Sequence, residues 1–160
     1  MKRGYIAVAS VALLGLAAMQ AHAASNLSSS LRVESRAGQV LVHVEVHNGG
    51  ARTIYVPRAL AADPQPLGKT FTVTTGQGAA PVDYTGRMVK RGPIGPDDFV
   101  AVQPHGTLRH TIDISASYAF LPGTHAYTLT YAGAAVPALA QLDSTQALTP
   151  APARFTHTAP

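Results

Sequence analysis

The sequence predicts an all-β fold, an immunoglobulin-like β-sandwich of about seven short antiparallel strands over residues 24–131. The first observation is that short segments of alternating apolar and polar residues recur along the chain. The second is that turns rich in Gly and Pro separate these segments. The third is that no segment after residue 23 repeats its apolar residues with the period of a long helix. Together these patterns indicate two packed sheets.

The clearest strand covers residues 39–47, where one side carries only valine, at Val40, Val42, Val44 and Val46. The other side carries mostly polar residues, which are Leu41, His43, Glu45 and His47. A period of two over this length predicts a half-buried strand whose valines face the core. Asn48-Gly49-Gly50 follows and is typical of a turn, because these residues tolerate positive φ.

The other expected strands are shorter. Alternation or short apolar runs predict them at residues 27–34, 53–57, 69–75, 82–84, 99–102, 107–115 and 125–131. Residues 57–68 contain three prolines, which predicts a loop. Residues 115–120 are expected to form one helical turn, with Asp113 or Ser115 available to cap it.

Tyr127 follows the turn Leu121-Pro122-Gly123-Thr124 in a spacing typical of a tyrosine corner, in which a Tyr hydroxyl bonds back to the turn backbone. Beyond it, residues 132–160 are rich in Ala and Pro and poorly patterned, so we interpret them as a tail. Its residues 153–158 form either a last edge strand or part of a disordered segment.

Residues 1–23 have the organisation of a secretory signal peptide. Lys2 and Arg3 form a positive start, an apolar run covers residues 6–19, and Ala21-His22-Ala23 fits an A-x-A cleavage site. The apolar run has about 14 residues, whereas a membrane-spanning helix needs about 20, which favours a signal peptide over an anchor. We therefore expect an exported chain, periplasmic or extracellular, that begins near Ala24 and has no membrane span.

The composition excludes several functional classes. The chain has no Cys, which excludes disulfides, thiolate zinc sites and cysteine nucleophiles. Without Lys2 and Arg3, the 12 basic residues become 10 against 8 acidic ones, a net charge of +2 that gives no support for nucleic-acid binding. The sequence contains no Gly-x-Ser-x-Gly elbow and no phosphate-binding loop. Neither catalytic residues nor a cofactor is predicted.

The segment His43-Val44-Glu45-Val46-His47 has the residue types of a zinc-protease motif in a different order. That motif works on a helix, where its two His face one metal. On a strand, His43 and His47 lie about 13 Å apart, too far to share one zinc. His43 and Glu45 could hold a weak metal site with a ligand from another strand, but a solvated strand face is the simpler interpretation. His110, on the apolar side of its strand, is typical of a hydrogen-bonded core histidine.

Residues 83–102 combine a basic pair, several turn-forming residues and an acidic pair. Lys90 and Arg91 could dock a partner's carboxylate, or keep an exposed edge from pairing with other sheets. They are also a dibasic pair, and so a cleavage point if exposed. Asp97 and Asp98 could bind a cation, although an acidic turn is the ordinary interpretation. We take as candidate partner-binding or loop-organising residues Tyr84, Lys90, Arg91, Asp97 and Asp98.

Several short motifs of this stretch and its surroundings occur in order in a known family. They are Tyr84-x-Gly86-x-x-Val89-Lys90-Arg91-Gly92-Pro93, Asp98-Phe99-Val100, Pro104-x-Gly106, Asp113-Ile114-Ser115-x-x-Tyr118, Gly123-x-x-x-Tyr127 and Tyr131. Over about residues 31–131 the sequence resembles the N-terminal, non-catalytic β-domain of the deuterolysin / peptidyl-Lys metallopeptidase family. The resemblance implies a propeptide-like domain that assists the folding of a secreted zinc protease or inhibits it.

The chain departs from that family in its catalytic equipment. The family's protease domain carries His-Glu-x-x-His and a further Asp ligand, and no His-Glu pair occurs in this sequence. No catalytic residue is carried over, so the protein is not predicted to be an enzyme. The first hypothesis is an exported chaperone or inhibitor of a secreted metallopeptidase. The second is a stand-alone adhesion or surface-interaction module, and the third is a small metal-dependent hydrolase that uses His43 and Glu45.

Overall fold

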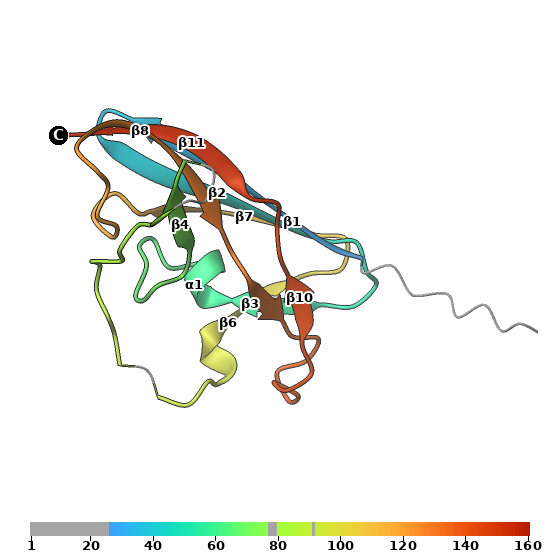
Figure 1. Ribbon diagram of the computed structural model, residues 1–160. Coiled ribbons are helices and arrows are strands. Elements are labelled where there is room, and N and C mark those ends of the chain that lie inside the picture. Colours follow the sequence, from blue (N-terminus) through green and yellow to red (C-terminus); the bar gives the residue numbers. More distant parts are fainter. Residues whose placement is uncertain (1–25, 77–79, 91) are drawn as a thin grey trace, which may run out of the picture.

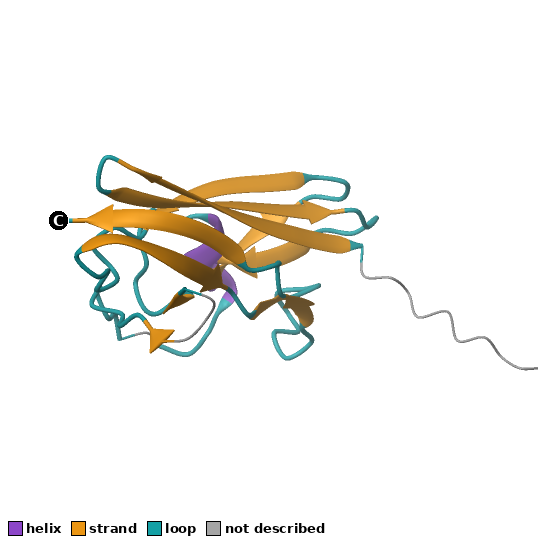
Figure 2. Ribbon diagram, turned by 45° about the horizontal axis from the view of Figure 1, so that its top comes forward, coloured by secondary structure: helices purple, strands orange, loops and turns teal. Residues whose placement is uncertain are grey.

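The computed structural model describes residues 26–76, 80–90 and 92–160, so the signal peptide expected at residues 1–23 and the candidate Arg91 lie outside the described residues. Within them the predicted all-β sandwich is confirmed (Figures 1 and 2). One layer is a three-stranded antiparallel sheet in the order β1-β2-β7. Its strands are β1 (Leu27–Arg36), β2 (Gln39–Asn48) and β7 (Thr107–Asp113).

The second layer is a four-stranded antiparallel sheet in the order β11-β8-β4-β5. Its strands are β4 (Thr72–Thr75), β5 (Ala80–Pro81), β8 (Gly123–Thr130) and β11 (Ala153–Ala159). In the described part of the chain, no helix is long and apolar enough to cross a membrane.

Two short strand pairs complete the sandwich at one end. They are β3 (Ile54–Pro57) with β6 (Phe99–Val102), and β9 (Gly133–Ala135) with β10 (Gln146–Leu148). Tyr55 and Val136 exchange two backbone hydrogen bonds of 2.9 Å, which join the two pairs. The remaining elements are single turns, the helix α1 (Arg58–Ala61) and the 3₁₀ turn η1 (Pro96–Asp98).

The core lies between the two layers. The four valines of β2 are buried, with exposures of 0–3%, as their alternation predicts. They belong to one apolar cluster with Ile112 of the same sheet, with Val73, Tyr127 and Leu129 of the opposite sheet, and with Phe71 just before β4. Because each layer buries one face of its strands, polar residues remain on the outer faces.

Three local expectations were wrong. The strand expected at residues 82–84 is not formed, and Tyr84 makes an isolated β-bridge instead. Residues 57–68 were expected to be loop throughout, but Arg58–Ala61 form a helical turn that buries Leu60. Residues 115–120 were expected to form a helical turn, but they form a tight turn that leads into a β-bridge between Tyr118 and Tyr84. Asp113 does organise this turn, because its Oδ1 accepts from the backbone N–H of Ser115 at 2.9 Å.

Residues 132–160, interpreted from the sequence as a tail, carry β9, β10 and β11. Strand β11 pairs with β8 along its whole length, from Ala153 opposite Leu129 to Ala159 opposite Gly123. Of the two alternatives for residues 153–158, the last edge strand is thus present as β11, and the sandwich extends beyond the boundary expected after Tyr131.

The tyrosine corner expected at Tyr127 is present. The ring is 1% exposed, and its hydroxyl accepts a hydrogen bond of 3.0 Å from the backbone N–H of Leu121. Phe120 and Phe155 pack against the same ring, with centroid distances of 5.1 and 5.5 Å. The corner thus fixes the turn before β8 to the aromatic part of the core.

His157 is a buried titratable group on β11. Its Nδ1 is hydrogen-bonded to Ser35 Oγ at 2.9 Å, the ring of Phe120 lies with its centroid 4.9 Å away, and His125 is its cross-strand neighbour on β8. Burial lowers the pKa of His157, because the charged imidazolium is poorly solvated there.

The free energy of unfolding is therefore expected to fall in acid because of His157. The unfolded chain binds a proton at the ordinary histidine pKa of about 6.5, whereas folded His157 binds it only at lower pH. The contribution is complete above about pH 6.5 and is lost as the pH falls through the lowered pKa. Urea unfolding of wild type and His157→Gln on both sides of that value should show a smaller acid loss in the variant. Equal acid-induced losses of stability in the two proteins would show that His157 is not the group responsible.

Candidate functional site

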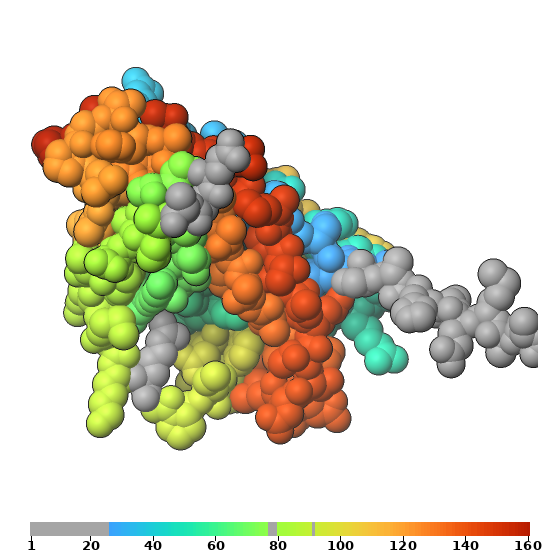
Figure 3. All heavy atoms as spheres, viewed as in Figure 1, coloured from blue at the N-terminus to red at the C-terminus, as the bar shows by residue number. Residues whose placement is uncertain are grey.

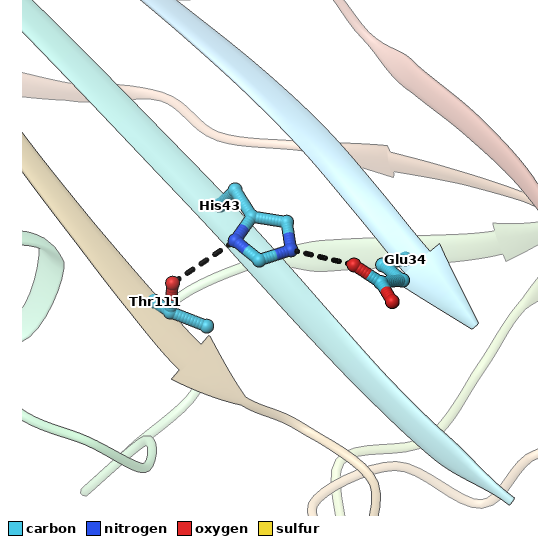
Figure 4. A network of polar contacts seen from close by, with 3 residues as sticks. All are labelled: Glu34, His43 and Thr111. Carbon is cyan, nitrogen blue, oxygen red and sulfur yellow. Dashed lines mark hydrogen bonds and ion pairs between the residues drawn. The ribbon is translucent and has the colours of Figure 1, made fainter. Parts of the chain in front are cut away.

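The weak metal candidates His43 and Glu45 lie on the outer face of the three-stranded sheet. Figure 4 shows His43 between two partners, with Nδ1 2.9 Å from Thr111 Oγ1 and Nε2 3.3 Å from Glu34 Oε2. Glu45 instead accepts from Arg109 Nε at 2.8 Å. Each candidate is thus engaged by a different partner. Within residues 26–76, 80–90 and 92–160, no group of three or more His, Asp or Glu is placed to hold a metal ion.

A hydroxyl, an imidazole and a carboxylate in a row also occur in nucleophilic catalysis. Here the His–Thr pairing repeats along β2 and β7. His47 Nδ1 lies 3.0 Å from Thr107 Oγ1, and the Glu45–Arg109 ion pair lies between the two His–Thr pairs. Directly opposed partners of this kind stabilise a sheet. The repetition favours a structural ladder on an open sheet face over a catalytic site.

His110 lies where the sequence placed it, on the inward side of β7. The ring is partly buried, and its Nε2 is 2.9 Å from the backbone carbonyl oxygen of Asp63. It therefore anchors the loop after α1 to the sheet.

Tyr84 begins the irregular segment that precedes β6. Its hydroxyl proton is shared between the carbonyl oxygens of Arg87 at 2.8 Å and Pro66 at 3.2 Å, and its ring packs edge-on against Tyr118. Gly86 leaves room for this arrangement, because a Cβ atom there would lie 2.7 Å from the Tyr84 hydroxyl oxygen. Of the two roles considered for Tyr84, loop organisation fits this geometry directly.

The acidic pair ends the same segment at η1. Asp98 Oδ2 accepts from the backbone N–H of Gly95 at 2.9 Å, and the Asp98 N–H donates to the Gly95 carbonyl oxygen at 3.0 Å. Asp97 and Lys90 are exposed. The candidates therefore divide into Tyr84 and Asp98, which shape the segment, and Lys90 and Asp97, which lie on its surface.

Between these anchors lies a segment that we call the apolar loop, residues 86–90 and 92–98. It carries three large apolar side chains on the surface, with exposures of 76% for Met88, 44% for Val89 and 71% for Ile94. Among the described residues, the remaining exposed large apolar side chain is Leu121, at 46%. Sequence reasoning missed these residues. The available signal was large aliphatic residues in a Gly- and Pro-rich stretch without strand alternation.

The apolar loop borders a groove of about 720 Å³. The groove runs between Ile94, η1 and Phe99 on one side and the segment of residues 136–145 on the other. We call these two sides the lobes of the groove. Figure 3 shows them beside each other at the lower edge of the molecule, coloured yellow and orange-red. Grooves of this volume with a mostly apolar lining are common sites of ligand binding.

Comparison with known proteins gives fold likeness only. No family model matches the chain, and no curated protein matches it. The ASH / PapD-like domain of human CEP192 (PapD-like domain 7) is similar with a TM-score of 0.46, 14% identity and 98% of each chain covered.

Two further solved structures are similar at lower scores. The structural-genomics target SoR45 has a TM-score of 0.40, 11% identity and 84% of each chain covered. The periplasmic chaperone SfaE has a TM-score of 0.36 and 14% identity, and the match covers 83% of this chain and 56% of the chaperone. At these scores the likenesses carry no argument about partners or activity.

Proposed function

We propose that this protein is an exported, non-catalytic β-sandwich that binds another protein through its apolar loop. The observation that carries the proposal is the exposure of Met88 and Ile94, 76% and 71%, on one loop. Two large apolar side chains that are mostly exposed on one loop give a partner apolar surface to bury. The loop is held at both ends, by Tyr84 and by the Asp98–Gly95 hydrogen bonds, so it presents these side chains on an ordered base.

The partner class that we propose is a secreted zinc metallopeptidase, whose folding the protein assists or whose activity it inhibits. The family resemblance motivates this choice, and its densest motif, Tyr84-x-Gly86-x-x-Val89-Lys90, coincides with the apolar loop. Exposed Lys90 supplies a positive charge next to the apolar side chains, and Asp97 supplies a negative one. A charged rim around an apolar centre is typical of protein interfaces.

The test uses the purified protein as bait for a secreted deuterolysin-type metallopeptidase of the same organism. Wild type is expected to retain the protease and to change its activity or refolding yield. The affinity of the double variant Met88→Ser/Ile94→Ser for the protease should be lower by about tenfold or more. The reason is that burying one large apolar side chain contributes about 1.5–3 kcal/mol.

Leu121→Ser is the matched control, because Leu121 is also exposed but lies outside the apolar loop. Its retention of the protease should equal that of wild type. If the double variant retained the protease as well as wild type does, the interface would have to lie outside the apolar loop. No retention from a fraction with demonstrated protease activity would refute the metallopeptidase partner and leave the adhesion module as the remaining hypothesis.

A further inference from the structure

The outer face of the three-stranded sheet is hollowed above its central strand. Two neighbouring rows of residues, each in register from β1 through β2 to β7, line a hollow of about 560 Å³. The rows are Arg32-His43-Thr111 and Ser30-Glu45-Arg109. The hollow shares no lining residue with the groove beside the apolar loop.

Arg32, on β1, brings an uncompensated charge to this hollow. Its side chain is exposed, and it forms no hydrogen bond or ion pair with another residue in the part of the chain that the structure describes. A guanidinium stays charged in proteins, and its flat fork of N–H groups matches the paired oxygens of an oxyanion. A single exposed arginine is simply hydrated, so the inference depends on what else faces the hollow.

Arg109 adds a second set of donors from β7, on the opposite side of the hollow. Its Nε–H is donated to Glu45 Oε2 at 2.8 Å, and the side chain is 72% exposed. Its Nη groups have no partner among the described residues. Strands β1 and β7 lie about 10 Å apart across β2, a distance that two arginine side chains can span toward one bound group.

The carboxylates near the hollow already have partners. Glu45 accepts from Arg109, Glu34 lies in the next row with Oε2 3.3 Å from His43 Nε2, and Asp113 holds the turn after β7. With its histidines not counted, the lining holds two guanidiniums against one carboxylate. Positive charge and free N–H donors are therefore in surplus, which favours a ligand with negatively charged oxygens.

From this combination we infer that the outer face of the three-stranded sheet binds an oxyanion between the Arg32 and Arg109 guanidiniums. Ser30 and Thr111 line the same hollow and add hydroxyl groups beside them. Carboxylate, phosphate and sulfate groups share the required chemistry. The site goes beyond the proposed function, because it needs no protease and shares no residue with the apolar loop.

NMR titration of the purified protein, followed through the Nε–Hε signals of its arginines, tests the site. The probes are sodium phosphate, sodium sulfate and sodium glutarate, with sodium chloride at equal ionic strength as the reference. The Arg32 and Arg109 signals are expected to shift along one saturation curve, with a Kd in roughly the millimolar range that suits a small ligand held by few contacts. The probe with the lowest Kd identifies the class of oxyanion.

Three variants locate the binding. Arg32→Gln should raise the Kd of that probe about tenfold, because a charge-assisted contact is lost. Arg36→Gln is the matched control and should leave the Kd unchanged, because Arg36 is exposed on the same face of β1 but does not line the hollow. Glu45→Gln removes a negative charge and keeps an acceptor for Arg109, so it should lower the Kd about threefold.

Thermal melts confirm that each variant is folded. Shifts that match those in chloride for all three probes would overturn the inference. Equal weakening by Arg32→Gln and Arg36→Gln would also overturn it, since the response would then follow net charge alone. Saturable oxyanion binding without capture of the metallopeptidase would uphold this site and refute the proposed partner class, whereas capture without a saturable shift would uphold the partner and refute the site.

Discussion

Replacement of Asn48 by alanine is expected to lower the free energy of unfolding by about 3 kcal/mol or more. The side chain is 2% exposed and serves four backbone groups at once. Its Nδ2 has two N–H groups and lies 2.8, 3.0 and 3.1 Å from the carbonyl oxygens of Arg52, Val102 and Gln103, so two of these acceptors share one N–H. Its Oδ1 accepts from the Gly50 N–H at 3.1 Å. Alanine would leave the Val102 carbonyl oxygen unpaired where its hydrogen bond is buried, and would also remove the part-buried hydrogen bonds to Arg52, Gln103 and Gly50.

Urea unfolding of three variants tests this expectation. Asn48→Asp keeps the shape but points a second oxygen at three carbonyl oxygens, so it should destabilise the fold at least as much as alanine. Gln103→Ala is the control, because its exposed side chain is removed while its backbone carbonyl stays, and a change within about 0.5 kcal/mol is expected. A loss below about 1 kcal/mol for Asn48→Ala would show that these hydrogen bonds do not hold the end of β2.

The sequence was a good guide where structure follows from local periodicity. The valines of β2 alternate without interruption, and a strand with one buried face is the conformation that buries all four. The inward side of β7, with Ile112 buried, was predicted for the same reason. The tyrosine corner was also accessible, because the turn and Tyr127 are close in sequence.

Sequence reasoning failed where the deciding contacts are distant. Asn48 looked like a turn residue, but its amide joins β2 to the end of β6, and nothing next to it in the sequence indicates that partner. Strands β9 and β10 consist largely of Ala and Gly without alternation, so they depend on distant partners, which are each other and the Tyr55–Val136 hydrogen bonds to β3. The strands on either side of residues 35–38 were predicted but no turn was assigned between them, and Ala37, with φ of 51°, is an unusual residue in a left-handed conformation.

The sequence and the structure direct attention to the same segment for different reasons. In the sequence the charged residues Lys90, Asp97 and Asp98 stand out, because charges in a turn-rich stretch are visible there, whereas the structure adds the exposed apolar side chains of this loop. The exposure of Met88 and Ile94 was missed, because large apolar residues are expected to be buried, and their place in a Gly- and Pro-rich stretch was not weighed against that expectation. The groove was not predictable either, because its second lobe comes from a region that the sequence left unpatterned.

Replacement of Tyr118 by phenylalanine is expected to cost about 2–3 kcal/mol, although it removes a single oxygen atom. The ring is 4% exposed, and its hydroxyl donates to the Phe71 carbonyl oxygen at 2.7 Å and accepts from the Phe71 N–H at 3.2 Å. Burial raises the pKa of Tyr118 to about 12, against the opposing effect of the hydrogen bond with Phe71. The hydroxyl therefore stays neutral at physiological pH and satisfies both backbone groups of Phe71 just before β4.

Tyr84→Phe is the control that shows how much of the stability loss in Tyr118→Phe comes from the burial of the hydrogen-bonded groups. The Tyr84 hydroxyl also makes two hydrogen bonds, to the Arg87 and Pro66 carbonyl oxygens, but the first of these is exposed and water can replace the lost donor. Its expected cost is about 1 kcal/mol or less. The two tyrosines pack against each other with ring centroids 5.4 Å apart, so both variants keep that aromatic contact. If urea unfolding gave equal losses, the buried Phe71 backbone would not be the reason that Tyr118 carries a hydroxyl.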